Sequence, residues 1–327
     1  MMLSLDETFK RHKIRNLQID PYGICNAKCW FCPVKYKKVP DQSKQVMSPE
    51  LLRKILNNMV EERQKEDGLV DKNFGVFYTS HYNEILLYPH FEELLKIAKE
   101  LKLCFVILSN GIPLTPEKVD LIVKYKEVVN GICLNIPAFE PELWSKRSGI
   151  NIKQYDKLIS NINYAIDNLP SKVNSKVFTI IINGMNNNSM NGIVAGADFP
   201  SDIDLDNEVL KQTQLARQLF PKLPINVNTD LRDRGGSIDN VFVNKTKEGK
   251  VVGCHNDGKI GGRPVGWIHI NASGNAFLCC NDYDMETTFG DFNTQELKDF
   301  WGTTEHQDKI NNLQQTLCTK CSEAIYE

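Results

Sequence analysis

The residues best suited to chemistry in this chain are three cysteines, Cys25, Cys29 and Cys32, which fall within eight consecutive positions. Thiolates at this spacing can bind three corners of a cubane iron–sulfur cluster. The fourth iron then has no protein ligand in the same run and stays open to a small molecule. A zinc ion would need a fourth ligand close by, and a disulfide framework would need an even number of cysteines. The spacing therefore favours an iron–sulfur cluster with one open iron.

The order C-x3-C-x2-C resembles the signature of the radical S-adenosylmethionine (SAM) superfamily. The resemblance implies that SAM chelates the open iron of a [4Fe–4S] cluster. One electron then cleaves SAM to a 5′-deoxyadenosyl radical, which abstracts a hydrogen from the substrate. In this superfamily the residue before the third cysteine packs on adenine, a role that falls here on Phe31. An electron donor such as a flavodoxin or ferredoxin is an implied partner.

The same resemblance implies where the rest of SAM is bound. Glu84 aligns with the carboxylate of the superfamily's Gly-Gly-Glu stretch, which binds the methionine ammonium group. Tyr82 and Asn83 replace both glycines, and a tyrosine adopts unusual backbone dihedrals poorly. Further SAM contacts are implied for three polar residues at the ends of predicted strands, namely Ser109, Asn110 and Asn135.

A second group of cysteines occupies the last quarter of the chain, at Cys254, Cys279, Cys280, Cys318 and Cys321. Their arrangement resembles the SPASM or twitch extensions of radical SAM enzymes, which bind auxiliary iron–sulfur clusters. We expect one auxiliary [4Fe–4S] cluster, bound by Cys254, Cys279, Cys318 and Cys321. Cys280 is the alternative to Cys279 as the cluster ligand. On a strand the two side chains should point to opposite faces. A zinc site with four cysteines stays an alternative.

The elements that position these residues alternate along the chain from about residue 16 to about residue 230. Short apolar runs predict strands at 16–20, 74–79, 103–108, 131–136, 176–182 and 224–228, separated by helical patterns. Such alternation predicts an α/β fold with parallel strands. The resemblance implies a partial (β/α)6 barrel, with the cluster loop after the first strand and the site at the carboxyl edge. Cys104 and Cys133 lie within predicted strands, and we expect both to be small core residues.

The sequence changes in character after residue 232. A hairpin is predicted from strands at 266–270 and 275–279, followed by a helical segment at 293–317. We therefore predict two domains, a radical SAM core at 1–232 and an auxiliary cluster domain at 233–327. Asp230 and Arg232 follow the sixth strand and are expected at the barrel mouth. There Asp230 would accept a proton from a substrate radical, and Arg232 would bind a substrate carboxylate or phosphate.

Composition limits the remaining classes of function. The chain has 327 residues, of which 41% are hydrophobic and 24% charged, and its formal net charge is −2. This near-neutral balance offers no broad electrostatic attraction for nucleic acid or for an anionic membrane. The sequence contains neither an apolar run of membrane-spanning length nor a signal-peptide pattern. Ten cysteines without an export signal indicate a reducing compartment, and we expect the cytoplasm.

The substrate is the part of the function that the residues specify least. Relatives with such extensions act on ribosomal peptides, protein side chains, sugars and aminocyclitols, and we rank modification of a peptide or protein first. A small-molecule alcohol or aminosugar dehydrogenase ranks second. The first predicted strand begins at Asn16, so we expect no leader-binding module before it. A non-catalytic iron–sulfur or zinc protein is an alternative of another class, supported by the loss of the two glycines.

Overall fold

The computed structural model describes residues 4–169, 178–183, 205–228, 234–238, 249–254, 263–321 and 323–327. Its centre is a nine-stranded sheet with the order β10-β9-β8-β1-β2-β3-β4-β5-β6. The six strands predicted first pair in parallel and in chain order: β1 (Asn16–Ile19), β2 (Val76–Thr79), β3 (Cys104–Ser109), β4 (Val129–Asn135), β5 (Phe178–Asn183) and β6 (Ile225–Asn228). The sheet is open, with β6 and β10 at its edges, so the predicted partial barrel is confirmed.

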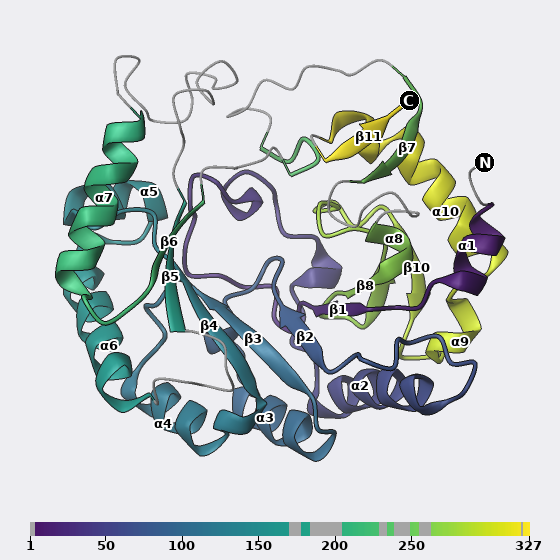
Figure 1. Ribbon diagram of the computed structural model, residues 1–327, viewed down its shortest axis with the longest axis horizontal. Coiled ribbons are helices and arrows are strands. Elements are labelled where there is room, and N and C mark those ends of the chain that lie inside the picture. Colours follow the sequence, from purple (N-terminus) through teal and green to yellow (C-terminus); the bar gives the residue numbers. More distant parts are fainter. Residues whose placement is uncertain are drawn as a thin grey trace.

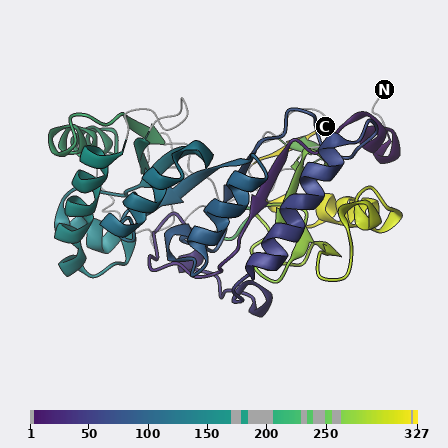
Figure 2. The ribbon, with the colours of Figure 1, turned by 90° about the horizontal axis from the view of Figure 1, so that it is seen from below.

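Helices cover the outer face of this curved sheet (Figure 1). They are α2 (Pro49–Gln64), α3 (Phe91–Glu100), α4 (Pro116–Lys124), α5 (Pro141–Ser148), α6 (Tyr155–Asn168) and α7 (Leu205–Leu219). In the view from below, α2, α3 and α4 follow one another along the outer side (Figure 2). Helix α2 begins after Ser48, whose side chain caps it by accepting a hydrogen bond from the Leu51 backbone N at 3.2 Å. Helix α5 is an element that the sequence analysis does not anticipate.

Side chains alternate between the two faces of the strands. On the outer face Phe105 is fully buried and packs edge-on against Phe91 of α3, with 6.3 Å between ring centroids. The inner face is only half-buried, because it lines the interior of the open barrel. Cys104 and Cys133 both lie half-buried on this inner face, in the same alternation as Leu108 and Asn135. The expectation that both cysteines are core residues is therefore wrong.

The C-terminal part of the chain extends the same sheet. Strand β8 (Trp267–Ile270) pairs in parallel with β1, and β9 (Asn275–Phe277) and β10 (Thr288–Asp291) follow in antiparallel order. The predicted hairpin is thus present and joined to the core by β1. The residues around the predicted domain boundary, 229–233, lie outside the described part, and the boundary stays a prediction.

Two strands and four short helices complete the described structure. Strand β7 (Val251–Cys254) pairs antiparallel with β11 (Ala324–Tyr326), as a separate small sheet. The helices are α1 (Leu5–Arg11), α8 (Arg263–Gly266), α9 (Leu297–Phe300) and α10 (Thr304–Gln315). The single helical segment predicted at 293–317 is therefore divided, because Gly302 adopts a positive φ of 74° between α9 and α10. Helix α1 lies beside α10 (Figure 1). There the rings of Phe9 and His306 are in contact, with 4.9 Å between their centroids.

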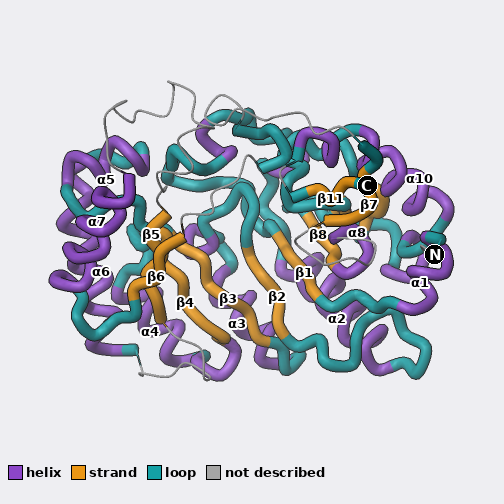
Figure 3. Tube along the Cα trace, turned by 45° about the horizontal axis from the view of Figure 1, so that its top comes forward, coloured by secondary structure: helices purple, strands orange, loops and turns teal. Residues whose placement is uncertain are grey.

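The loops after the parallel strands gather along one edge of the sheet (Figure 3). In parallel α/β folds, sites form at this carboxyl edge. Within the described part of the chain, no helix combines the length and apolarity that crossing a bilayer requires.

The close approach of Gly23 to Ser43 provides a test of how the cysteine loop is positioned. A Cβ atom at Gly23 would lie 1.6 Å from the carbonyl O of Ser43, so Gly23→Ala must displace one of these two backbones. We expect a loss of stability of about 2 kcal/mol or more, together with reduced iron content after anaerobic reconstitution. Thermal unfolding and iron analysis measure both effects.

The matched control is Gly75→Ala, whose added Cβ would meet only the carbonyl O of Asn73, at 3.9 Å. Gly75→Ala should behave like the unchanged protein. Normal stability and normal iron content in Gly23→Ala would contradict the tight packing of this loop.

Candidate functional site

The three cysteines of the first motif line one cavity of about 470 Å³ at the carboxyl edge of β1 to β4. The residues for which the sequence implies SAM contacts line the same cavity, namely Phe31, Glu84, Ser109, Asn110 and Asn135. They come from the cysteine loop and from the segments that follow or end β2, β3 and β4. The tertiary structure thus brings the predicted residues together, while their individual roles stay predictions.

The cysteine loop is held in place by backbone hydrogen bonds to the end of α5. The backbone N of Lys28 donates to the Ser148 carbonyl at 2.7 Å, and that of Trp30 donates to the Arg147 carbonyl at 3.0 Å. Carbonyls in the last turn of a helix have no partner within the helix. The loop therefore satisfies the open end of α5, and α5 in turn fixes the path of the loop between Cys25 and Cys32.

The state of the three thiols fits an iron–sulfur cluster. Burial raises the pKa of Cys25 to about 12, and the charge of Glu84 adds to the shift. Burial also raises the pKa of Cys29 and of Cys32, and at Cys29 the charges of Cys32 and Cys25 add to the effect. Three thiolates gathered in a buried place need a cationic partner. Iron supplies that charge, so the donor set suits the predicted group.

Glu84 connects the segments that follow two neighbouring strands. Its side chain is buried, and its two carboxylate oxygens accept hydrogen bonds from the backbone N of Asn110 at 2.7 Å and of Leu86 at 3.3 Å. Burial raises the pKa of Glu84 to about 7. The Asn110 side chain extends the connection to the cysteine loop, since its Nδ2 donates to Asn26 Oδ1 at 2.7 Å and lies 4.0 Å from Cys25 Sγ. Each oxygen of Glu84 retains capacity for a further donor such as an ammonium group.

The structure explains how this segment tolerates the loss of both glycines. The positive φ falls on His81, at 142°, and not on Tyr82, so the expected backbone problem at Tyr82 does not arise. Tyr82 donates from its backbone N to Asp20 Oδ2 at 3.0 Å, and Asn83 Nδ2 donates to Asp20 Oδ1 at 2.5 Å. The hydroxyl of Tyr82 donates to the Tyr283 carbonyl at 2.5 Å. The two replacements therefore anchor the segment to β1 and to the C-terminal part of the chain.

His81 and Asp20 form a buried polar pair beneath the cavity. The His81 ring stacks on Tyr283, with centroids 4.1 Å apart and planes at 14°, and its Nδ1 lies 3.8 Å from Asp20 Oδ2. Burial lowers the pKa of His81 to about 3 and raises that of Asp20 to about 7. The histidine is consequently neutral at physiological pH.

Three of the cysteines predicted for the auxiliary cluster gather at the small β7–β11 sheet. Cys254 ends β7 and pairs with Ala324 of β11, whose backbone N donates to the Cys321 carbonyl at 3.2 Å. Burial raises the pKa of Cys318 to about 12, and the charges of Cys321 and Cys254 add to the shift. The three thiols therefore lie close enough to influence one another.

The neighbours Cys279 and Cys280 have different surroundings. Asn281 donates from its backbone N to Cys279 Sγ at 3.4 Å and from its Nδ2 to Cys321 Sγ at 3.5 Å. Cys279 thus lies on the side of the auxiliary cysteines. Cys280 instead lines the cavity of the first motif. The arrangement supports Cys279 as the fourth auxiliary ligand, an assignment that stays a prediction.

The two residues predicted at the barrel mouth, Asp230 and Arg232, lie outside the described residues. The described part of the chain places Arg234 on the cavity wall instead. The sequence analysis did not select Arg234, Tyr283 or Asp20. For Asp20 a signal existed, because it ends the first predicted strand, as Asn135 ends the fourth. Nothing in the local sequence marks Tyr283.

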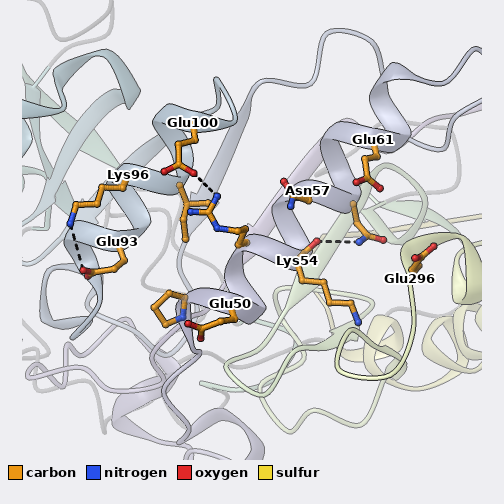
Figure 4. Close-up of a pocket in the computed structure, with 12 residues that line it drawn as sticks. Glu50, Lys54, Asn57, Glu61, Glu93, Lys96, Glu100 and Glu296 are labelled. Carbon is orange, nitrogen blue, oxygen red and sulfur yellow. Dashed lines mark hydrogen bonds and ion pairs between the residues drawn. The ribbon is translucent and has the colours of Figure 1, made fainter.

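A second groove, of about 550 Å³, lies over α2 and α3 and contains none of the predicted site residues. Its wall is mostly charged (Figure 4). Arg53 pairs with Glu100 across the groove, and Lys96 Nζ lies 3.7 Å from Glu93 Oε1. None of the predicted cluster cysteines or SAM-contacting residues lines this groove, so we place the chemistry at the cysteine cavity.

Comparison with known families identifies the family to which this chain belongs. The family profile described as the Radical SAM superfamily matches residues 19–195, which is more than half of the chain. The chain belongs to the radical SAM superfamily. A second profile, SPASM, described as an iron–sulfur cluster-binding domain, matches residues 262–322. This radical SAM protein accordingly binds a [4Fe–4S] cluster and SAM, and its C-terminal region is an auxiliary iron–sulfur domain, as predicted.

Solved structures share the fold at low sequence identity. BtrN in complex with AdoMet and 2-DOIA is 15% identical, with a TM-score of 0.52 over 95% of this chain and 93% of that one. Streptococcus suis SuiB bound to the precursor peptide SuiA is 13% identical, with a TM-score of 0.54 over 97% and 71%. The protein anSMEcpe with bound AdoMet is 14% identical, with a TM-score of 0.56 over 94% and 83%. No curated protein sequence matches the chain.

The raised pKa of Asp20 predicts a dependence of stability on pH. Burial raises this pKa from 3.8 to about 7, so the folded state retains a proton that the unfolded state has already released. The stabilisation is complete below pH 4 and is lost as pH rises through 7. The free energy of unfolding should therefore fall as pH rises from 5 to 7. We expect Asp20→Asn to reduce this slope by up to about 1.4 kcal/mol per pH unit, because it removes the titrating group.

Urea unfolding of anaerobic protein across that range measures the effect. Glu84 contributes a slope of the same sign, and the difference between the unchanged protein and Asp20→Asn isolates Asp20. The exposed Asp67→Asn serves as the control. Equal slopes in Asp20→Asn and the control would rule out a buried, protonated Asp20.

Proposed function

We propose that this radical SAM protein is an oxidoreductase or maturase that abstracts a hydrogen from a peptide or protein substrate. One observation carries the proposal. A single cavity contains the three cluster cysteines, the residues predicted to contact SAM, and further wall residues that no part of the cofactor accounts for. The bound cluster and SAM would supply a carbon radical able to attack an unactivated hydrogen.

The protein's own residues bind and orient these groups. Cys25, Cys29 and Cys32 would hold the cluster, and Glu84 would accept the methionine ammonium group of SAM. Phe31 would pack on adenine. Polar contacts to the remainder of SAM would come from Ser109, Asn110 and Asn135. The buried floor formed by His81 and Tyr283 would help to exclude water from the reactive carbon.

The auxiliary domain would serve electron transfer. Cys254, Cys279, Cys318 and Cys321 would bind all four irons of one auxiliary cluster, which leaves no open iron for the substrate. Such a cluster could accept the electron that remains when a substrate radical loses a proton. Reduction of the first cluster would come from a flavodoxin or ferredoxin. Ten cysteines in a chain without an export signal support a reducing, cytoplasmic location.

Each of the two candidate substrate classes has its own support. SuiB, which shares the fold, is seen with a precursor peptide, and this supports a peptide substrate. An alcohol or aminosugar dehydrogenase is the second candidate. It is favoured by the stacked, half-buried rings of Tyr78 and Trp267 on the cavity wall, 5.5 Å apart, which suit the apolar face of a sugar ring.

The decisive experiment is SAM cleavage by anaerobically reconstituted protein with dithionite. We expect 5′-deoxyadenosine from the unchanged protein. The triple variant Cys25→Ala, Cys29→Ala, Cys32→Ala should lose this activity and about four of about eight irons, and retain the absorbance of the auxiliary cluster. Absence of 5′-deoxyadenosine from the unchanged, fully loaded protein would favour a non-catalytic iron–sulfur protein. Equal loss of both clusters in the variant would contradict two separate sites.

Deuterium-labelled candidates then separate the two substrate classes. Transfer of deuterium from a labelled peptide into 5′-deoxyadenosine would support peptide modification. Transfer only from a labelled alcohol or aminosugar would support the dehydrogenase.

Cys279 and Cys280 offer a matched pair of variants for the auxiliary site. Cys279→Ser should reduce iron by up to about four atoms per chain, because it removes a ligand. Cys280→Ser changes the same functional group one residue away and should retain all iron. Iron and sulfide analysis with absorbance spectra checks both. The reverse pattern would make Cys280 the ligand.

A further inference from the structure

The cysteine cavity is electrically asymmetric. Cys25 lies beside a carboxyl group, since the charge of Glu84 is the main influence on its thiol after burial. Arg234 lines the same cavity as Cys32 and is the charged group that acts on the Cys32 thiol. The first cluster therefore would sit between an acidic end, at Glu84, and a basic end, at Arg234.

The basic end is built by the C-terminal part of the chain. Arg234 lines the cavity together with Cys280 and Tyr283, and these two residues and Cys32 are the groups that its charge meets most closely. Tyr283 is fixed by its stacking on His81 and by the hydrogen bond that its carbonyl accepts from Tyr82. These two contacts fix the position of Tyr283 on the cavity wall.

No ion pair joins Arg234 to a carboxylate among the described residues. The charge of Glu323 acts on it only after those of Tyr283, Cys280 and Cys32, and together these groups raise the pKa of Arg234 against the effect of burial. Arg234 is exposed, and it lines the cysteine cavity. A guanidinium in such a position binds carboxylate or phosphate by paired, charge-assisted hydrogen bonds.

SAM leaves this basic end available. Its ammonium group is assigned to Glu84, at the opposite end, and its carboxylate or ribose to Asn135 on β4. The sulfonium of SAM is cationic, so its carboxylate is the one group of SAM that could pair with a guanidinium, and the SAM affinity of Arg234→Gln tests that pairing. With the carboxylate bound at Asn135, the group that remains to approach the guanidinium is the substrate.

We propose that Arg234 binds an anionic group of the substrate, a carboxylate or a phosphate, and so selects acidic substrates. This inference rests on the proposed function, and it names the substrate's charge. Arg232, for which the sequence predicted such a role, lies outside the described residues; Arg234 fills that role on the cavity wall.

The test uses SAM-loaded holoenzyme and three probes: succinate, inorganic phosphate and neutral succinamide. Calorimetry should detect binding of at least one anion and none of succinamide. Tighter binding of succinate would indicate a carboxylate substrate, and tighter binding of phosphate a phosphorylated one. Arg234→Gln should weaken anion binding about tenfold or more, and Arg234→Lys by less, because lysine retains charge without the paired geometry. Arg53→Gln, in the groove over α2 and α3, is the matched control and should bind like the unchanged protein.

Three results would overturn the proposal. The first is that the unchanged protein binds no anion, and the second is that Arg234→Gln binds anions as tightly as the unchanged protein. The third is that Arg234→Gln loses as much affinity for SAM as it loses for the anion. The last would assign Arg234 to the cofactor. Melting temperature and iron content of each variant show whether the effect is structural. Production of 5′-deoxyadenosine by the unchanged protein is measured separately, so failure of the proposed function and failure of the Arg234 proposal are distinguished.

Discussion

The burial of three thiols around one cavity is the constraint on which the rest of the structure depends. Cys25, Cys29 and Cys32 cannot ionise together in a buried place unless a cationic group compensates them. The loop that carries them is held by backbone hydrogen bonds to the end of α5 and by the hydrogen bond between the Asn110 and Asn26 side chains.

The C-terminal part of the chain does more than carry a second cluster. Strand β8 pairs with β1, so the auxiliary segment continues the core sheet and contributes Trp267, Cys280 and Tyr283 to the cavity wall. The Tyr82 hydroxyl ties this wall to the segment that would hold SAM. The replacement of the usual glycines therefore has a structural use. It couples the segment after β2 to the C-terminal part of the cavity wall, while the positive φ falls on His81.

Much of the architecture was predictable because its signals are local. Apolar runs marked all six parallel strands, and the strands of the β8–β9 hairpin, within a few residues. The predictions failed where a local pattern was ambiguous. Cys104 and Cys133 read as core residues in apolar strands, yet the open barrel leaves their face half-buried. The helical pattern at 293–317 did not reveal the break at Gly302.

By itself the sequence determined the chemistry of the first site, because the spacing of three cysteines in one loop is a property of the covalent chain. It also determined the alternation of strands and helices, and hence the edge at which the site forms. The tertiary structure decided which residues from distant segments share the cavity. The buried Asp20–His81 pair depends on the pairing of β1 with β2, and the placement of Cys280 and Tyr283 on the cavity wall depends on the joining of β8 to β1. Pairing between strands so far apart in the chain is set by packing, which no local pattern records.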